Sequence, residues 1–221
     1  MDMTGNSPTP RGSLEDFAAQ VAHDFNNLLT GILGNLELLQ YRAERNNITG
    51  LNGYLEGATS AGNRAAAFTH RLLAFSGRDA QPGERVAVDE LLRRVTCNAT
   101  RRLDAGDAVV LCDPAQLELA ITELLENAAA ATHSRGAVTL SSALDGQHVV
   151  IRIRDTGHGM AAAILARATE PFFTTQTSSA GRGLGLSIVA RIAAQAGGTM
   201  QIDSTEGAGS TVTLRLPKTK L

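Results

Sequence analysis

The chain has 221 residues, of which 43% are hydrophobic and 19% charged, and a formal net charge of -2. Such a chain can bury one or two cores. With 20 basic and 22 acidic residues and no basic run, its composition does not favour nucleic acid or an anionic membrane as a partner. No apolar run is long enough for membrane insertion, and Cys97 and Cys112 lack a CxxC spacing. We therefore expect a cytoplasmic protein with reduced thiols.

The first half of the chain has the pattern of two long helices. Residues 1–13 contain no signal-peptide core and are expected to form a disordered tail, with Ser13 as the N-cap of the first helix and Asp16 as its capping-box acid. From Leu14 onward, apolar residues recur every three or four positions until about Arg45.

A second helix follows the turn "NNITG" (46–50) and should end at Gly77. Two long helices with a short loop predict an antiparallel hairpin over 14–80. Its apolar stripe needs a cover, and a homodimer forming a four-helix bundle would supply one.

After a linker at 81–85, residues 86–221 show short strands mixed with helices, which predicts a two-layer α/β sandwich and an α+β multidomain chain. One helix should begin at Asp113-Pro114 and run to about Ala131, and another should run from about Leu184 to Ala196. The expected strands are Val86–Val88, Val95–Ala99, Val109–Cys112, Ala137–Ala143, His148–Arg154, Thr199–Asp203 and Thr211–Leu216.

Polar residues on the first of these helices suggest a metal site. Glu123 and Asn127 are four residues apart, so their side chains share a face. An amide oxygen suits Mg²⁺, and a neighbouring carboxylate can order a water. A solvated helix face explains this pair alone equally well.

Two glycine-rich segments suggest a nucleotide site. In "DTGHGM", Gly157 and Gly159 let the backbone approach a flat ligand, and Asp155 can accept a hydrogen bond from an exocyclic amine such as that of adenine. In "GRGLGL" (181–186), the backbone amides precede a helix and can hold phosphates. That segment is neither a dinucleotide fingerprint nor a P-loop.

The order of these segments resembles the ATP-binding domain of histidine kinases. "ELLENAAAA", "DTGHGM", "EPFFTTQ", "GRGLGLSIV" and "GAGSTVTLRLP" match its N box, first glycine box, F box, second glycine box and closing strand, and "VAHDFNNLLTGI" resembles the phosphoacceptor box. The resemblance implies a two-component sensor histidine kinase with a Bergerat-type sandwich that binds Mg-ATP. It also implies that ligands come from Asn127 (metal and nucleotide), Asp155, Gly157, Gly159, Gly181, Arg182, Gly183, Leu184 and Gly185, with Glu123 catalytic.

The phosphoacceptor box has a chemical interpretation of its own. At 100° per residue, His23 lies about 200° from Val21 and Phe25, so it points away from the apolar stripe. A neutral imidazole can attack a phosphoryl group if a base such as Asp24 orients it. Asn27, on the same face, can align a water for hydrolysis of an acyl phosphate on a bound partner. The resemblance implies transfer from His23 to a response regulator receiver domain, which this protein would also dephosphorylate.

The lid departs from the family pattern, because Gln176 stands where the family commonly has lysine and Arg182 is the nearest replacement charge. The segment before "VVLCDP" is also short, which suggests abbreviated outer strands. Two alternatives remain: a phosphotransfer adaptor without catalysis, and an ATP-gated clamp of the same superfamily. The sequence leaves open the signal, the regulator, cis or trans transfer, and whether a separate sensor protein or a longer chain supplies the input.

Overall fold

The computed structural model describes residues 10–44, 51–76, 83–132, 136–175 and 183–219, with backbone only at 10–20, 22–24, 44, 70 and 75–76. The chain divides into two compact units, Met1–His70 and Arg71–Leu221. The boundary falls inside a helix, so the last turns of that helix belong to the second unit.

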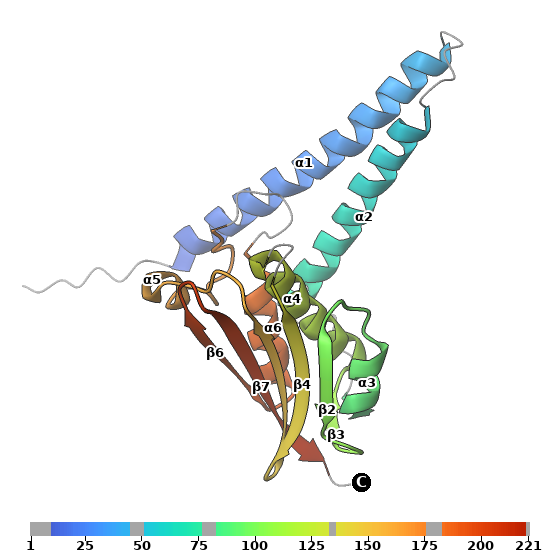
Figure 1. Cartoon of the computed structure of the whole chain (residues 1–221). Helices are drawn as coiled ribbons and strands as arrows, with labels where there is room; N and C mark the ends of the chain where they lie inside the picture. Colours follow the sequence, from blue (N-terminus) through green and yellow to red (C-terminus); the bar gives the residue numbers. More distant parts are fainter. Residues whose placement is uncertain (1–9, 45–50, 77–82, 133–135, 176–182, 220–221) are drawn as a thin grey trace, which may run out of the picture. The chain divides into compact units, whose positions relative to one another are not determined.

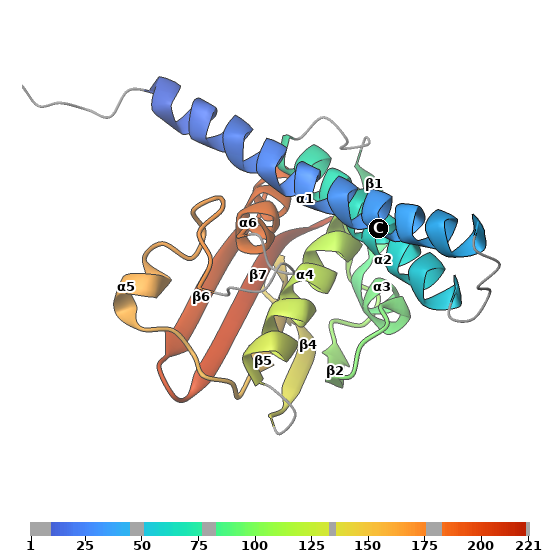
Figure 2. The same cartoon turned by 90° about the horizontal axis from the view of Figure 1, so that it is seen from above.

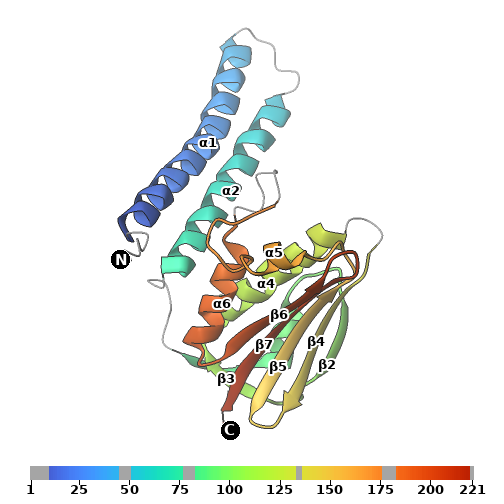
Figure 3. The same cartoon turned by 90° about the vertical axis from the view of Figure 1, so that its left-hand side faces the viewer.

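The first unit is a helical hairpin of α1 (Pro10–Glu44) and α2 (Leu51–Ser76), which run antiparallel (Figures 1 and 3). Small residues let the helices approach: a Cβ added at Gly57 would lie 2.5 Å from Oδ1 of Asn35. Nearer the loop, the Arg42 guanidinium lies 5.3 Å from the centroid of the Tyr54 ring. The predicted hairpin is confirmed.

The start of the first helix was predicted wrongly. The helix begins at Pro10, so residues 10–13 are helical rather than part of a tail, and Ser13 is an interior residue instead of the N-cap that Asp16 would complement. Proline suits the first helical position because its φ is already helical and its missing N–H has no partner there in any case. Residues 1–9 lie outside the described residues.

The second unit contains a mixed sheet with helices on one face (Figure 2). Among the described residues the strand order is β1-β3-β7-β5-β4-β2, β6 also pairs with β7, and all pairs are antiparallel except β2 with β4. The strands are β1 (Glu84–Ala87), β2 (Thr100–Asp104), β3 (Val109–Cys112), β4 (Val138–Asp145), β5 (His148–Asp155), β6 (Thr199–Thr205) and β7 (Gly209–Thr219). The helices are α3 (Val88–Arg94), α4 (Pro114–Thr132), α5 (Ala162–Leu165) and α6 (Gly185–Gln195).

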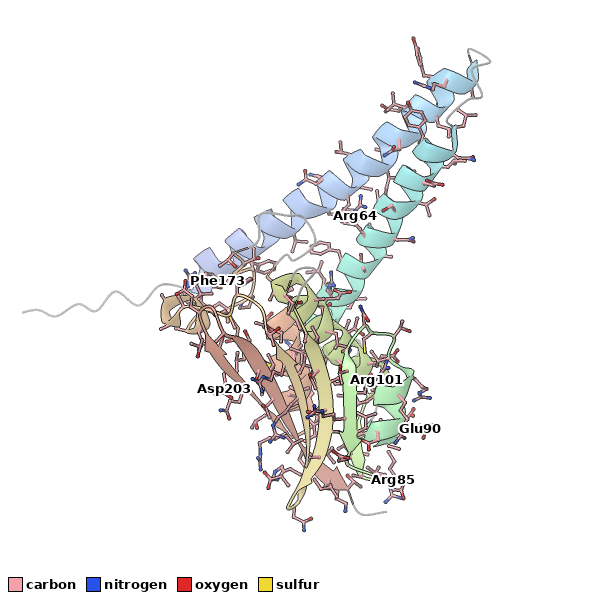
Figure 4. The ribbon with its side chains drawn as sticks, viewed as in Figure 1. Arg64, Arg85, Glu90, Arg101, Phe173 and Asp203 are labelled. Atoms are coloured by element: carbon pink, nitrogen blue, oxygen red, sulfur yellow. The ribbon has the colours of Figure 1, made fainter. Side chains whose placement is uncertain are left out.

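The core lies between the sheet and the two helices α4 and α6. Alternate residues of β5, such as Ile151 and Ile153, are buried, as a half-covered sheet requires, and so are Ile121 of α4 and Ile188 of α6. The opposite face carries polar side chains, for example Asp203 of β6 (Figure 4). The predicted two-layer sandwich is confirmed.

The start of α4 follows its sequence signals. Oδ1 of Asp113 accepts hydrogen bonds from the backbone N–H groups of Ala115 (2.9 Å) and Gln116 (3.2 Å), and Pro114 takes the first helical position. This cap fixes the register of α4, and with it the place of the polar residues near the other end of the helix.

Two details of the outer strands differ from expectation. The predicted strand Val95–Ala99 is wrong, because 95–99 is irregular and β2 follows it at Thr100–Asp104. Val88, predicted to end a strand, begins α3, and β1 starts at Glu84 within the expected linker. The exact domain boundaries stay a prediction. In the part of the chain that the structure describes, no helix combines the length and the hydropathy needed to cross a membrane.

The two thiols differ in accessibility, which gives a test of the fold. Cys112 is buried on β3, and burial, together with the neighbouring Asp113 carboxylate, raises its pKa to about 11, whereas Cys97 is half-exposed. At pH 8 the Cys112 thiolate fraction is about one in a thousand. We expect iodoacetamide at pH 8 to alkylate Cys97 in the native protein and Cys112 only after unfolding, as counted by peptide mass spectrometry. Equal native labelling would contradict the buried position of β3.

Candidate active site

A cavity of about 230 Å³ opens in the second unit beside α4, the end of β5 and the start of α6. It brings together predicted site residues that lie up to 62 positions apart in the sequence, from Glu123 to Gly185. The predicted site residues that line it are Glu123, Asn127, Asp155, Gly159, Gly183, Leu184 and Gly185. Gly157 is not one of the lining residues, but its backbone N–H donates to Oδ1 of Asp155.

Asp155 lines the cavity and is only 6% exposed. Its Oδ1 accepts two backbone hydrogen bonds, from Gly157 N–H (2.8 Å) and Ser210 N–H (3.3 Å). Among the described residues, Oδ2 takes part in no hydrogen bond. The carboxylate is therefore held by one oxygen, and the other remains an acceptor on the cavity side.

The loop after β5 is held closely by backbone on two sides. His158 N–H donates to the carbonyl of Ala131 at the end of α4, and Gly207 N–H donates to the carbonyl of His158. Gly159 has φ +62°, and a Cβ at this position would run into the backbone carbonyl of Thr205. Only glycine fits there, which explains the second glycine of "DTGHGM".

The start of α6 also lines the cavity. Phe172 N–H donates to the carbonyl of Gly183 at 2.8 Å, and Gly183 has φ +68° with no room for a Cβ against Phe172 backbone. This bond joins the F box to the second glycine box. Leu184 and Gly185 follow, so the first turn of α6 borders the cavity, and the first amides of a helix have no partner within the helix and lie at its positive dipole end.

Glu123 and Asn127 of α4 face this helix start. A Cβ added at Gly185 would lie 2.8 Å from Oε2 of Glu123 and 3.2 Å from Nδ2 of Asn127, so both side chains reach the same point. Burial raises the pKa of Glu123, the ion pair with Arg71 opposes this shift, and the charge of Glu126 adds to it. The pKa of Arg71 is also raised: burial alone would lower it, but the two carboxylates more than compensate.

The oxygen donors here suit a hard cation. An amide oxygen and a carboxylate beside a helix N-terminus are the ligands that Mg²⁺ uses together with phosphate oxygens and waters. Among the described residues, no group of three or more His, Cys, Asp or Glu side chains forms a dedicated metal cage. The residues therefore fit a cation that arrives with a phosphate ligand.

Two family models match the chain. The one described as histidine kinase-, DNA gyrase B- and HSP90-like ATPase matches residues 112–220, and the one described as the His Kinase A (phospho-acceptor) domain matches residues 13–81. The first contains all the predicted residues of the cavity, and the second contains His23. The chain belongs to the histidine kinase family.

Named relatives agree with this assignment. Sensor kinase CckA of Brucella abortus (strain 2308) is 33% identical over 228 residues, which cover 91% of this chain and 24% of the relative. Sensor histidine kinase ZraS of Escherichia coli (strain K12) is 32% identical over 235 residues, covering 93% of this chain and 46% of the relative. The chain thus spans between about a quarter and a half of the length of these histidine kinases.

Solved structures share the fold. Full-length ShkA in complex with AMPPNP has a TM-score of 0.66 and 26% identity, over 93% of this chain and 46% of that one. The catalytic domain of histidine kinase ThkA has a TM-score of 0.56 and 25% identity, over 62% of this chain and 97% of that one.

Several predicted residues are not among the described residues that line the cavity. His23 and Asp24 are on α1, where the structure describes their backbone, and Asn27 is exposed one turn later on the same helix. Gln176, Gly181 and Arg182 lie outside the described residues. Their roles stay predictions.

Other cavity residues are absent from the predicted set. Ser210 and Phe173 come from segments that carry the family resemblance, and the guanidinium of Arg167 lies 4.2 Å from the centroid of the Phe173 ring (Figure 4). His158 lies between the two glycines of the first glycine box. Arg71 is different: it lies 52 residues before Glu123, and no local pattern marks it.

Proposed function

We propose that this chain is the catalytic part of an ATP-dependent protein-histidine kinase. It binds Mg-ATP in the cavity, moves the γ-phosphoryl group to His23, and passes it to an aspartate of a response regulator. The observation that carries the proposal is that Asp155, the Glu123–Asn127 pair and the first residues of α6 all line one cavity.

The Asp155 end suits the adenine ring. The exocyclic amine of adenine would donate to Oδ2 of Asp155, because Oδ1 already accepts two backbone N–H groups. Ile153 and Val212, which also line the cavity, supply apolar surface for the ring. This arrangement favours an adenine nucleotide over one that carries a carbonyl at the same ring position.

The α6 end suits the phosphates. The amides of the first α6 turn would hold phosphate oxygens, and Oδ1 of Asn127 would be the protein's ligand to the bound Mg²⁺. Mg²⁺ supplies charge neutralisation at the phosphates when it is bound. Glu123, beside Asn127, would orient a water or a proton donor at the same place.

Transfer needs a nucleophile, and His23 is the proposed one. A ring nitrogen of His23 attacks the γ-phosphorus, a P–N bond forms, and the bond to the β–γ bridging oxygen breaks to release ADP. The adjacent Asp24 would orient the ring and stabilise the developing positive charge. Asn27, exposed one turn later, would align a water when the kinase dephosphorylates its regulator.

The hairpin also suits a second copy and a regulator. In one chain it exposes large apolar side chains that a four-helix bundle would cover, including Phe25, Leu29, Leu33, Leu36 and Leu55. We therefore assign a homodimer. The receiver domain of the response regulator would dock beside His23, and the input would come from a separate sensor protein or from further sequence.

Two other functions fit less well. A phosphotransfer adaptor without catalysis has no use for a formed cavity with Asp155, Asn127 and the glycines in place. A clamp ATPase shares the 112–220 segment, and that family description names such ATPases, but it gives no reason for a phospho-acceptor match over 13–81.

One labelling experiment separates these functions. The protein is incubated with γ-labelled ATP and Mg²⁺, and protein-bound label is tested for stability in acid and in base. We expect label that is lost in acid and kept in base, as phosphohistidine requires. ATP hydrolysis without protein-bound label would indicate an ATP-gated clamp ATPase. Neither label nor hydrolysis, with acceptance of a phosphoryl group from another kinase, would indicate an adaptor.

A further inference from the structure

Arg71 connects the end of α2 to the predicted catalytic helix α4. It is the first residue of the second unit, although it comes from the 13–81 segment. Its Nε donates to Oε1 of Glu123 at 2.5 Å, and its Nη2 donates to Oε2 of Glu126 at 2.8 Å. One guanidinium therefore holds two carboxylates one turn apart on α4.

This contact is not an ordinary surface ion pair. The Glu123 side chain is 7% exposed and that of Arg71 is 23% exposed, and both line the cavity. A buried carboxylate needs a charged or hydrogen-bonding partner, whereas an exposed pair adds little. Within the described residues, Arg71 makes the only ion pair to Glu123.

The contact also decides where Glu123 points. Oε1 is taken by Arg71, while Oε2 is the atom nearest the Cα–Cβ direction of Gly185, next to the Asn127 amide. Glu126, which is more exposed, accepts a hydrogen bond from Nη2 of the same guanidinium. The two hydrogen bonds of the Arg71 guanidinium thus hold the Glu123 carboxylate with Oε2 toward the start of α6, where the proposed function puts the phosphates.

We propose that Arg71 is a positioning residue of the kinase reaction, which keeps the carboxylate of Glu123 directed at the phosphate end of the cavity. The inference rests on the proposed function. It means that the ATP site is incomplete within the matched ATPase segment 112–220 and takes one side chain from the end of α2.

The test compares Arg71→Ala and Arg71→Lys with wild type for the rate of phosphohistidine formation, the KM for ATP and the affinity for ADP. We expect Arg71→Ala to lower kcat by about 10- to 100-fold, as loss of alignment does, with KM and ADP affinity within about threefold of wild type. Arg71→Lys should recover part of the rate, because lysine restores the positive charge but lacks the planar, paired N–H donors of arginine.

Arg64→Ala is the matched control. Arg64 is an exposed arginine two turns earlier on the same helix and bonds to Ser60 (Figure 4), so its removal should leave kcat unchanged. A second control is the double variant Arg71→Ala/Glu123→Gln. If Arg71 acts through Glu123, the double variant should be no slower than Glu123→Gln alone.

Three outcomes would overturn the proposal: unchanged kcat in Arg71→Ala, an equal loss of kcat and ADP affinity, or independent effects of the two substitutions. The failure of the proposed function looks different, because wild type itself would then form no phosphohistidine. If wild type labels normally and Arg71→Ala labels equally well, only the role of Arg71 is wrong.

Discussion

His23→Ala is expected to reduce phosphohistidine formation to background while ADP affinity stays within about twofold of wild type. The substitution removes the only proposed nucleophile, the ring nitrogen of His23. The proposed nucleotide contacts come instead from the cavity residues of α4, β5 and α6 in the second unit. Autoradiography after incubation with γ-labelled ATP, together with an ADP titration, measures both quantities.

A matched control uses another histidine of the chain. His148 begins β5, pairs in register with Asp145 of β4, and does not line the cavity. His148→Ala should therefore label like wild type. Undiminished labelling of His23→Ala would remove His23 from the mechanism, and a large loss of ADP affinity would mean that α1 contributes to the nucleotide site.

The long elements were predictable because their periodicity reports burial directly. In α4, the apolar positions Leu117, Ile121 and Leu124 repeat at helical spacing and are all buried against the sheet. β5 alternates over Ile151 to Arg154 because only one of its faces is covered. Such patterns are visible in the sequence because the face of an element that meets the core consists of apolar residues.

The outer strands were less predictable for a physical reason. Among the described strands, β2 lies at the edge of the sheet and pairs with β4 alone, and its sequence, "TRRLD", has four exposed residues of five. Without a buried face it has no alternation to read, so its position is set by pairing with β4. The residues before it, starting with the buried Val95, have the sequence pattern of a strand, but they form irregular structure after α3.

The candidate site, like the fold, has a part that could be predicted from the sequence and a part that could not. Asp155 and its glycines were found because the loop requires those residue types at fixed spacing, and the structure shows the requirement at Gly159. Arg71 was missed because its partner Glu123 is distant in sequence. A contact between a helix end and a helix 52 residues later leaves no local pattern, and only the folded chain brings the charges together.

Asp155→Asn is expected to weaken ADP binding by roughly 10- to 150-fold, which corresponds to the loss of about 1.5 to 3 kcal/mol for a hydrogen bond to a charged group. The backbone hydrogen bonds to Asp155 determine how the side-chain amide of the asparagine would be oriented. Gly157 and Ser210 both donate to Oδ1, so the asparagine oxygen must take that position and its NH₂ must take the position of Oδ2. The loop keeps both anchors, and the thermal midpoint should change little.

The same substitution should change base preference, which a simple loss of folding would not do. An NH₂ facing the exocyclic amine of adenine sets donor against donor, whereas the carbonyl of guanine at that position can accept from it. Calorimetric titrations with ADP and GDP should therefore show a smaller ADP-to-GDP affinity ratio in Asp155→Asn than in wild type. Asp203→Asn is the control, because Asp203 is exposed on β6, where it accepts from Gln201 (Figure 4). If Asp155→Asn kept wild-type ADP affinity and the wild-type ratio, adenine would not lie at Asp155, and the nucleotide would have to bind in another orientation along the cavity.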